Sequence, residues 1–148
     1  MHRRELVRLF ASAALGLGVL AARNSTAMAP MGLHADMYGI CVKACTDCQA
    51  SCSACVKHCE GMIKAGNAAH GKSKKLAEDC RDICAAAAKL TARKGPMSAA
   101  ICDACAKACD ACGAECVKYP DMKTMQDCVK SCKACAKACR AMAASHKA

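Results

Sequence analysis

The chain has 148 residues, which suits one domain of ordinary size. It contains 17 Cys, 9 Met and 5 His but only one Phe, two Tyr and no Trp. This composition excludes a core of large apolar side chains and an enzyme that needs only a few catalytic thiols. The net charge of +10 is spread along the chain with almost no aromatic residues beside it. We interpret it as solvated helix faces and expect no nucleic-acid partner.

The first 29 residues have the features of an export signal. Arg3-Arg4 open the chain, a low-charge run covers residues 9–22, and Ala27-Met28-Ala29 is the small-x-small pattern at which signal peptidases cut. The paired arginines resemble a twin-arginine (Tat) signal. The apolar run of about 14 residues is too short to span a bilayer comfortably, although an uncut membrane anchor is the alternative. We therefore expect residues 30–148 to be periplasmic and to keep no stable membrane association.

The cysteines alternate between spacings of three and four residues. This is the a/d heptad pattern, which places every thiol of one helix on its core-facing side. The intervening Ala, Lys, Asp, Gln and Ser residues suit a helix with a wet outer face. The runs are Cys41, Cys45, Cys48, Cys52, Cys55 and Cys59; Cys80 and Cys84; Cys102, Cys105, Cys109, Cys112 and Cys116; and Cys128, Cys132, Cys135 and Cys139.

Breaks between these runs predict four helices. Gly66-Asn67, Gly95-Pro96 and Tyr119-Pro120 separate them, and Ser73 and Asp121 are candidate N-caps. Connections this short force antiparallel neighbours, so the expected fold is all-α, an up-down-up-down four-helix bundle with a cysteine-lined core. The helices are expected near residues 36–64, 73–93, 97–118 and 121–144.

Two structural uses and one enzymatic use of so many cysteines compete with metal binding. Cysteine can serve as a small hydrophobe, but 17 at core positions would leave a bundle underfilled. A disulfide scaffold suits an exported chain, yet 17 is odd, and Cβ atoms three or four residues apart on a helix lie about 5–6 Å apart where a disulfide needs about 3.8 Å. Cross-helix disulfides stay possible. A thiol oxidoreductase would need Cys-x-x-Cys at a helix start beside a βαβ pattern, so we expect no enzyme.

The remaining interpretation is a site for a soft metal. Zinc and iron–sulfur clusters typically use short motifs on turns and loops, whereas Cu(I) accepts two or three thiolates. Pairs four residues apart can close on one Cu(I), and bridging thiolates would raise the capacity towards one ion per cysteine. The alternative is sequestration of zinc, silver or mercury by the same thiols. Eight such pairs exist: 41/45, 48/52, 55/59, 80/84, 105/109, 112/116, 128/132 and 135/139.

Over residues 36–146 the chain resembles the bacterial copper storage proteins. The resemblance is carried by Cys41-Val-Lys-Ala-Cys45-Thr-Asp-Cys48, by Cys102-Asp-Ala-Cys105-Ala-Lys-Ala-Cys109 and by Cys132-Lys-Ala-Cys135-Ala-Lys-Ala-Cys139. It implies a four-helix bundle that stores multiple Cu(I) ions per chain, and a homotetramer. The leader places this chain with the exported branch of that family.

Four further residues continue the thiol stripes at one end of the predicted bundle. His34 and Met37 precede Cys41, while Met142 and His146 follow Cys139. Imidazole and thioether bind Cu(I) more weakly than a thiolate pair, which suits a mouth through which the ion passes. The alternative for Met37 and Met142 is a plain apolar plug.

Other histidines and methionines have less definite positions. Met31 and Met97 are expected near the same mouth, whereas Met62 and Met125 are candidates for lining the closed end. His58 points about 100° away from the cysteine stripe and is expected on the surface.

Overall fold

A computed structural model describes the backbone of residues 31–146 and the side chains of residues 37–146. In these residues it contains four α-helices, one short 3-10 helix and no strand, which confirms the predicted all-α fold. The predicted export signal, residues 1–29, lies outside them. The elements are α1 (Met31–Lys64), η1 (Ala68–His70), α2 (Gly71–Ala92), α3 (Ser98–Cys116) and α4 (Lys123–Ser145).

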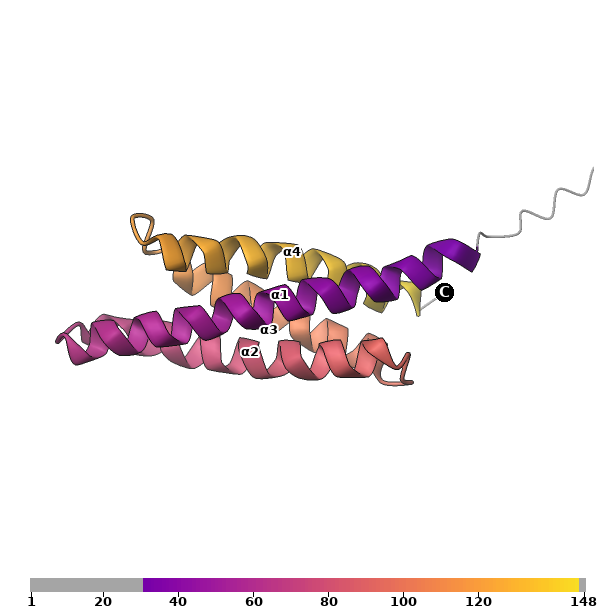
Figure 1. Cartoon of the computed structure of the whole chain (residues 1–148), viewed down its shortest axis with the longest axis horizontal. Helices are drawn as coiled ribbons and strands as arrows, with labels where there is room; N and C mark the ends of the chain where they lie inside the picture. Colours follow the sequence, from indigo (N-terminus) through magenta and orange to yellow (C-terminus); the bar gives the residue numbers. More distant parts are fainter. Residues whose placement is uncertain (1–30, 147–148) are drawn as a thin grey trace, which may run out of the picture.

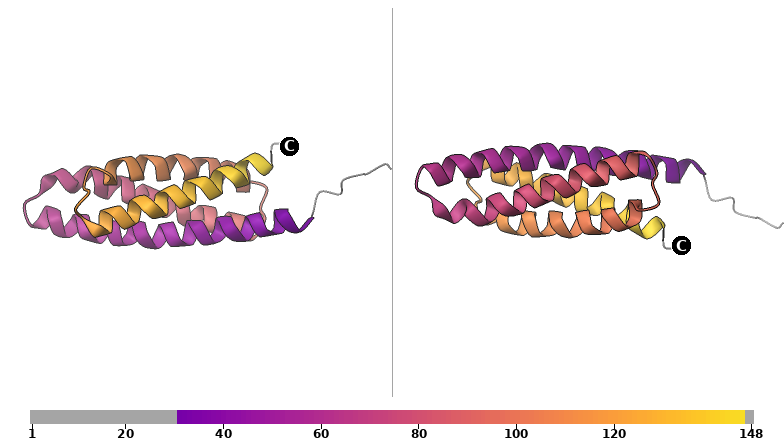
Figure 2. Two further views of the ribbon diagram at one scale, coloured as in Figure 1. Left: turned by 90° about the horizontal axis from the view of Figure 1, so that it is seen from above. Right: turned by 90° about the horizontal axis from the view of Figure 1, so that it is seen from below.

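The four helices form an elongated antiparallel bundle (Figures 1 and 2). Helix α1 packs beside α2 and α4, and α3 packs beside the same two helices. The start of α1 lies near the end of α4 and the α2–α3 connection, which together we call the mouth end. The connections that contain η1 and residues 117–122 lie together at the opposite end, which we call the far end.

Two predicted helix caps were wrong. Helix α2 has His70 at its N-cap position and α4 has Met122, and neither makes a side-chain capping hydrogen bond. Ser73 is instead buried inside α2, because it lies on the core-facing stripe of that helix. Helix α1 continues through Gly61 to Lys64, and the chain then turns at Gly66 with φ of +93°, a conformation that glycine adopts without strain.

The core consists of the 17 cysteines and a few small or flexible residues. Every cysteine side chain is at most 1% exposed. Alanines such as Ala77, Ala87 and Ala136 fill the gaps between helices, and Met125 and Met142 are the largest fully buried side chains. The heptad stripe therefore predicted the interior correctly.

Charged side chains lie on the outside of the bundle. Many form ion pairs one helical turn apart, such as Lys43 with Asp47 at 2.6 Å and Lys107 with Asp103 at 2.8 Å. Exposed pairs of this kind stabilise a helix only slightly. No helix in the described part of the chain is long and apolar enough to cross a membrane.

The fold predicts a stable apo protein. The reduced chain without metal should give a helical far-ultraviolet circular dichroism spectrum, because Ala and Lys favour helix and buried thiols pack as small hydrophobes. Cu(I) should then raise the melting temperature by binding only the native state. An unstructured spectrum without metal would instead indicate folding coupled to metal binding, as in zinc fingers.

Candidate metal centre

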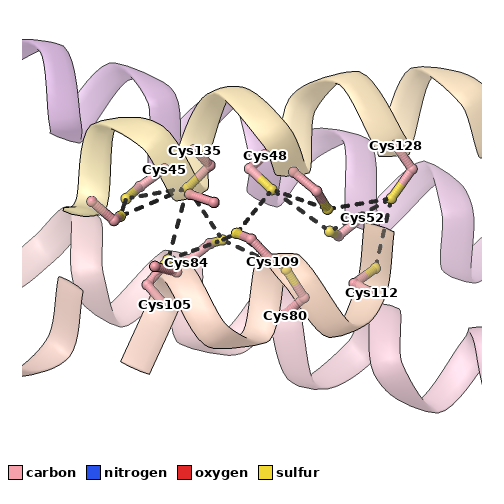
Figure 3. Packing of buried hydrophobic residues seen from close by; sticks show 14 of the residues in the cluster. Cys45, Cys48, Cys52, Cys80, Cys84, Cys105, Cys109, Cys112, Cys128 and Cys135 are labelled. Carbon is pink, nitrogen blue, oxygen red and sulfur yellow. Dashed lines mark hydrogen bonds between the residues drawn. The ribbon is translucent and has the colours of Figure 1, made fainter. Parts of the chain in front are cut away.

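The thiols of all four helices meet along the bundle axis and form a continuous column (Figure 3). Neighbouring Sγ atoms from different helices approach to 3.5–3.9 Å: Cys41 and Cys102 are 3.5 Å apart, Cys84 and Cys105 are also 3.5 Å apart, and Cys52 and Cys128 are 3.9 Å apart. These are ordinary contact distances for heavy atoms, about 3.5–4.0 Å. The column is thus close-packed thiol, and all 17 cysteines are free.

Sets of three or four Sγ atoms in this column lie within 4.8 Å of one another. Of the five sets named below, two take one cysteine from each of the four helices, and three take theirs from α1, α3 and α4. Several cysteines belong to two sets, so that each set is linked to the next along the axis. The sets include Cys41, Cys102 and Cys139; Cys45, Cys105, Cys135 and Cys139; Cys48, Cys84, Cys109 and Cys135; Cys48, Cys80, Cys109 and Cys132; and Cys52, Cys112, Cys128 and Cys132.

The predicted pairs within one helix are only part of this geometry. Cys48 and Cys52 are 3.9 Å apart, and Cys135 and Cys139 are also 3.9 Å apart. Contacts between helices are at least as short, for example 3.5 Å between Cys45 and Cys139. Two bonds of about 2.3 Å would span about 4.6 Å in a straight line and about 4.0 Å at a trigonal centre. An ion between two of these thiols therefore needs only a small outward movement of sulfur.

The packing of the thiols shifts their proton affinities. Hydrogen bonding with Cys109 and Cys132 lowers the pKa of Cys48 to about 6, because the neighbouring thiols stabilise the thiolate. At the far end the main influence is different, since burial raises the pKa of the Cys59 thiol. Next to Cys48 the direction is reversed, because hydrogen bonding with Cys112 and Cys128 raises the pKa of Cys52. The packed thiols therefore share their protons unevenly.

The structure describes the side chains of three of the four predicted ligands at the mouth end. Met142 is fully buried, Met37 is half-buried against the core, and His146 is exposed. His146 Nδ1 lies 3.1 Å from the carbonyl oxygen of Met142, so it carries the proton, and Nε2 accepts a 2.9 Å hydrogen bond from the Tyr38 hydroxyl. The side chains of His34 and Met31 lie outside the described residues, and Met97 is 58% exposed.

The far end contains more metal-binding groups than the sequence interpretation assigned to it. Met125 is fully buried with its Sδ 3.6 Å from Cys55 Sγ, whereas Met62 is half-buried. His58 is half-buried rather than fully exposed, and its Nε2 lies 3.4 Å from Met122 Sδ.

The sequence interpretation missed His70, which is fully buried with its Nδ1 3.8 Å from Cys59 Sγ. Burial, with a smaller contribution from the charge of His58, lowers the pKa of His70, so its ring is neutral near pH 7. Thr91 was missed as well; it is buried with its hydroxyl 3.5 Å from Cys102 Sγ. A signal for both existed, because residues 70, 73, 77, 80, 84, 87 and 91 continue the alternation of three and four on α2.

These features define a helical bundle whose interior is a donor set for soft metal ions. The family model described as copper storage protein matches residues 34–144, and the chain belongs to this family. No curated protein matches the chain.

Solved structures of copper storage proteins have the same fold. Apo copper storage protein 3 from Bacillus subtilis is 37% identical with a TM-score of 0.63, and the match covers 71% of this chain and 97% of that one. The Cu(I)-bound copper storage protein BsCsp3 is 36% identical with a TM-score of 0.65, covering 72% and 98%. A cytosolic copper storage protein from Streptomyces lividans, loaded with five coppers, is 27% identical with a TM-score of 0.70, covering 76% and 97%.

Thr91 offers a test of whether the column sets the capacity. Thr91→Cys should bind more Cu(I) per chain than the unmodified protein, because it places a further thiol beside Cys102 in the core-facing stripe of α2. Thr91→Val is the matched control, since it removes the hydroxyl at nearly constant volume and adds no ligand. Anaerobic loading followed by native mass spectrometry gives the count. Equal capacities of the two variants would contradict a column that extends past Cys84 towards the mouth.

Proposed function

We propose that this protein stores Cu(I) as thiolate complexes along the whole column. The observation that carries the proposal is the sharing of cysteines between adjacent sets, since Cys48, Cys109, Cys132, Cys135 and Cys139 each belong to two of them. A shared thiolate can bridge two ions. Cu(I) accepts the two or three sulfur ligands that such bridging leaves for each ion.

The charge of the core favours Cu(I) over zinc. Four zinc ions in four-cysteine sets would leave two net negative charges at each site, whereas one Cu(I) per thiolate is neutral. Buried net charge costs several kcal/mol per ion unless it is paired. No Lys or Arg is buried among the described residues, and the one buried carboxylate, Glu115, pairs with Lys118 and Lys72 at the surface. The interior therefore provides no compensation for an anionic cluster.

The same argument predicts the stoichiometry. Reduced chain titrated anaerobically with Cu(I) should fill well past the eight ions that separate i,i+4 pairs could hold, towards the 17 thiols. Metal and protein are counted by native mass spectrometry, and a parallel titration with Zn(II) and Co(II) serves as the control. Saturation at about four ions, with tetrahedral cobalt spectra, would favour zinc and contradict copper storage.

We assign the protein no catalytic role. Each Cys-x-x-Cys in the described chain lies inside a helix and is buried, whereas a redox motif needs an exposed thiol at a helix start. A storage function requires only that ions enter, remain and leave.

Export and assembly are further parts of the proposal. The Arg3-Arg4 leader and the Ala27-Met28-Ala29 motif support Tat-dependent export to the periplasm and cleavage after Ala29. Family membership supports a homotetramer. An outer groove between α1 and α4, lined by Ile40 and by alanines of both helices, offers an apolar surface for such association.

We also propose that copper passes through the mouth end. Thioether and imidazole hold Cu(I) more weakly than thiolate pairs, so His34, Met37, Met142 and His146 would transfer ions to the column at Cys41 and Cys139. The contact of Tyr38 with His146 supports this placement, because it joins the start of α1 to the end of α4.

Replacing these four residues with Ala should change the rate at which a chelator removes copper and leave the capacity nearly unchanged. Stopped-flow measurement of copper transfer to a chromogenic chelator gives the rate. Met62→Ala at the far end, also a half-buried thioether, is the matched control and should have much less effect. Equal effects at both ends would contradict the assigned mouth.

A further inference from the structure

The thiol column ends at the far end against a buried histidine. His70 belongs to η1, which connects α1 to α2, and its side chain is fully buried. Its Nδ1 faces Cys59 Sγ at 3.8 Å. Cys59 is the last cysteine of α1. The His70 imidazole therefore lies next to the last thiol of that helix.

The surroundings hold this ring in one orientation. Tyr119 stacks on it with ring centroids 4.3 Å apart and 24° between the planes, and His58 contacts it edge-on at 5.8 Å. The Tyr119 hydroxyl donates a 3.2 Å hydrogen bond to the carbonyl oxygen of Ala69, which fixes the backbone of η1 beside the ring. Ligands positioned in advance in this way favour metal binding.

Two buried polar atoms at this end have no partner in the described chain. They are His70 Nε2 and Ser73 Oγ, one helical turn apart at the start of α2, and they are the only buried side-chain nitrogen and oxygen atoms found without a hydrogen bond there. Buried polar groups in native proteins are nearly always satisfied, so unsatisfied ones indicate a missing ligand or water. The nitrogen that faces Cys59 is the other one, Nδ1, so a metal bound there would leave the ring proton on Nε2.

The distance between Cys59 and His70 fits a metal ion. Bonds of about 2.3 Å to sulfur and about 2.0–2.1 Å to nitrogen would place the two donors about 4.3 Å apart in a straight line. The observed 3.8 Å corresponds to a bend to about 120°, the angle of a three-coordinate centre. Cys55 lies four residues before Cys59 on the same face of α1 and is positioned to be the third donor.

We propose that Cys59 Sγ and His70 Nδ1 together bind one Cu(I) ion, a mixed thiolate–imidazole site that closes the thiol column at its far end. The site rests on the proposed function, because it takes its ion from the same Cu(I) pool. Binding replaces the thiol proton of Cys59, which leaves to solvent, and copper stays Cu(I), so no electron is transferred. The thiolate balances the charge of the ion and the neutral imidazole adds none, in keeping with the uncharged core.

The test is Cu(I) loading of the full chain, reduced and anaerobic, with 15N-labelled histidine. The His70 ring-nitrogen resonances should shift as loading approaches saturation, and Cys59→Ser, which keeps His70, should abolish that shift. His70→Ala should hold one ion fewer than the unmodified chain by native mass spectrometry. Glu60→Ala is the control, a residue next to Cys59 whose carboxylate pairs with Lys74, and should keep the full count.

The outcomes separate this site from the storage function. If the unmodified chain fills past eight ions while the His70 resonances stay in place, the mixed site is wrong and thiolate storage stands. The same conclusion follows if the His70 shift persists in Cys59→Ser. If no more than about four ions bind, the storage proposal fails and this site fails with it.

Discussion

The close packing of thiols against one another is the constraint on which the rest of the structure depends. In an ordinary bundle, Leu and Phe at the core-facing positions hold the helices at their usual spacing. Here the same positions carry cysteine, and alanine fills between them, so Sγ atoms on different helices come within 3.5–3.9 Å. From the sequence we expected 17 cysteines at core positions to leave the bundle underfilled. The structure corrects this picture, because the sulfur atoms already touch.

This correction changes what copper must do on binding. An ion cannot simply occupy a void; it has to take the place of thiol protons and push sulfur atoms apart by a few tenths of an ångström. The energetic gain is then the exchange of S–H for S–Cu bonds inside a dry, uncharged interior. A bundle that is folded without metal and changes little on loading is suited to metal storage, because binding and release do not require the chain to unfold.

Much of this architecture was predictable because it follows from a one-dimensional pattern. The alternation of three and four residues sufficed to place all 17 cysteines inside and to count four helices. The N-caps were not predictable in the same way. Ser73 has the right residue type for a cap, but it lies on the core-facing stripe of α2 and is buried. The sulfur sets that combine several helices were not predictable from the sequence either. The spacing along one helix fixes its i,i+4 neighbours but does not determine the register between helices. Contacts such as Cys48 with Cys109 depend on that register.

The two ends of the column differ in a way that the spacing alone could not reveal. Both end in methionine and histidine on the continued stripes, so the pattern treats them alike. In the structure, His146 at the mouth end is exposed and both of its ring nitrogens are hydrogen-bonded within the protein, which makes it a ligand that must release other partners before it binds. His70 at the far end is buried, faces a thiol and leaves one nitrogen without a partner. An exposed ligand with competing hydrogen-bond partners suits the passage of ions, whereas a buried and fixed one suits a site where an ion stays. The direction that we propose for the store, open at one end and closed by a bound ion at the other, thus rests on burial rather than on residue type.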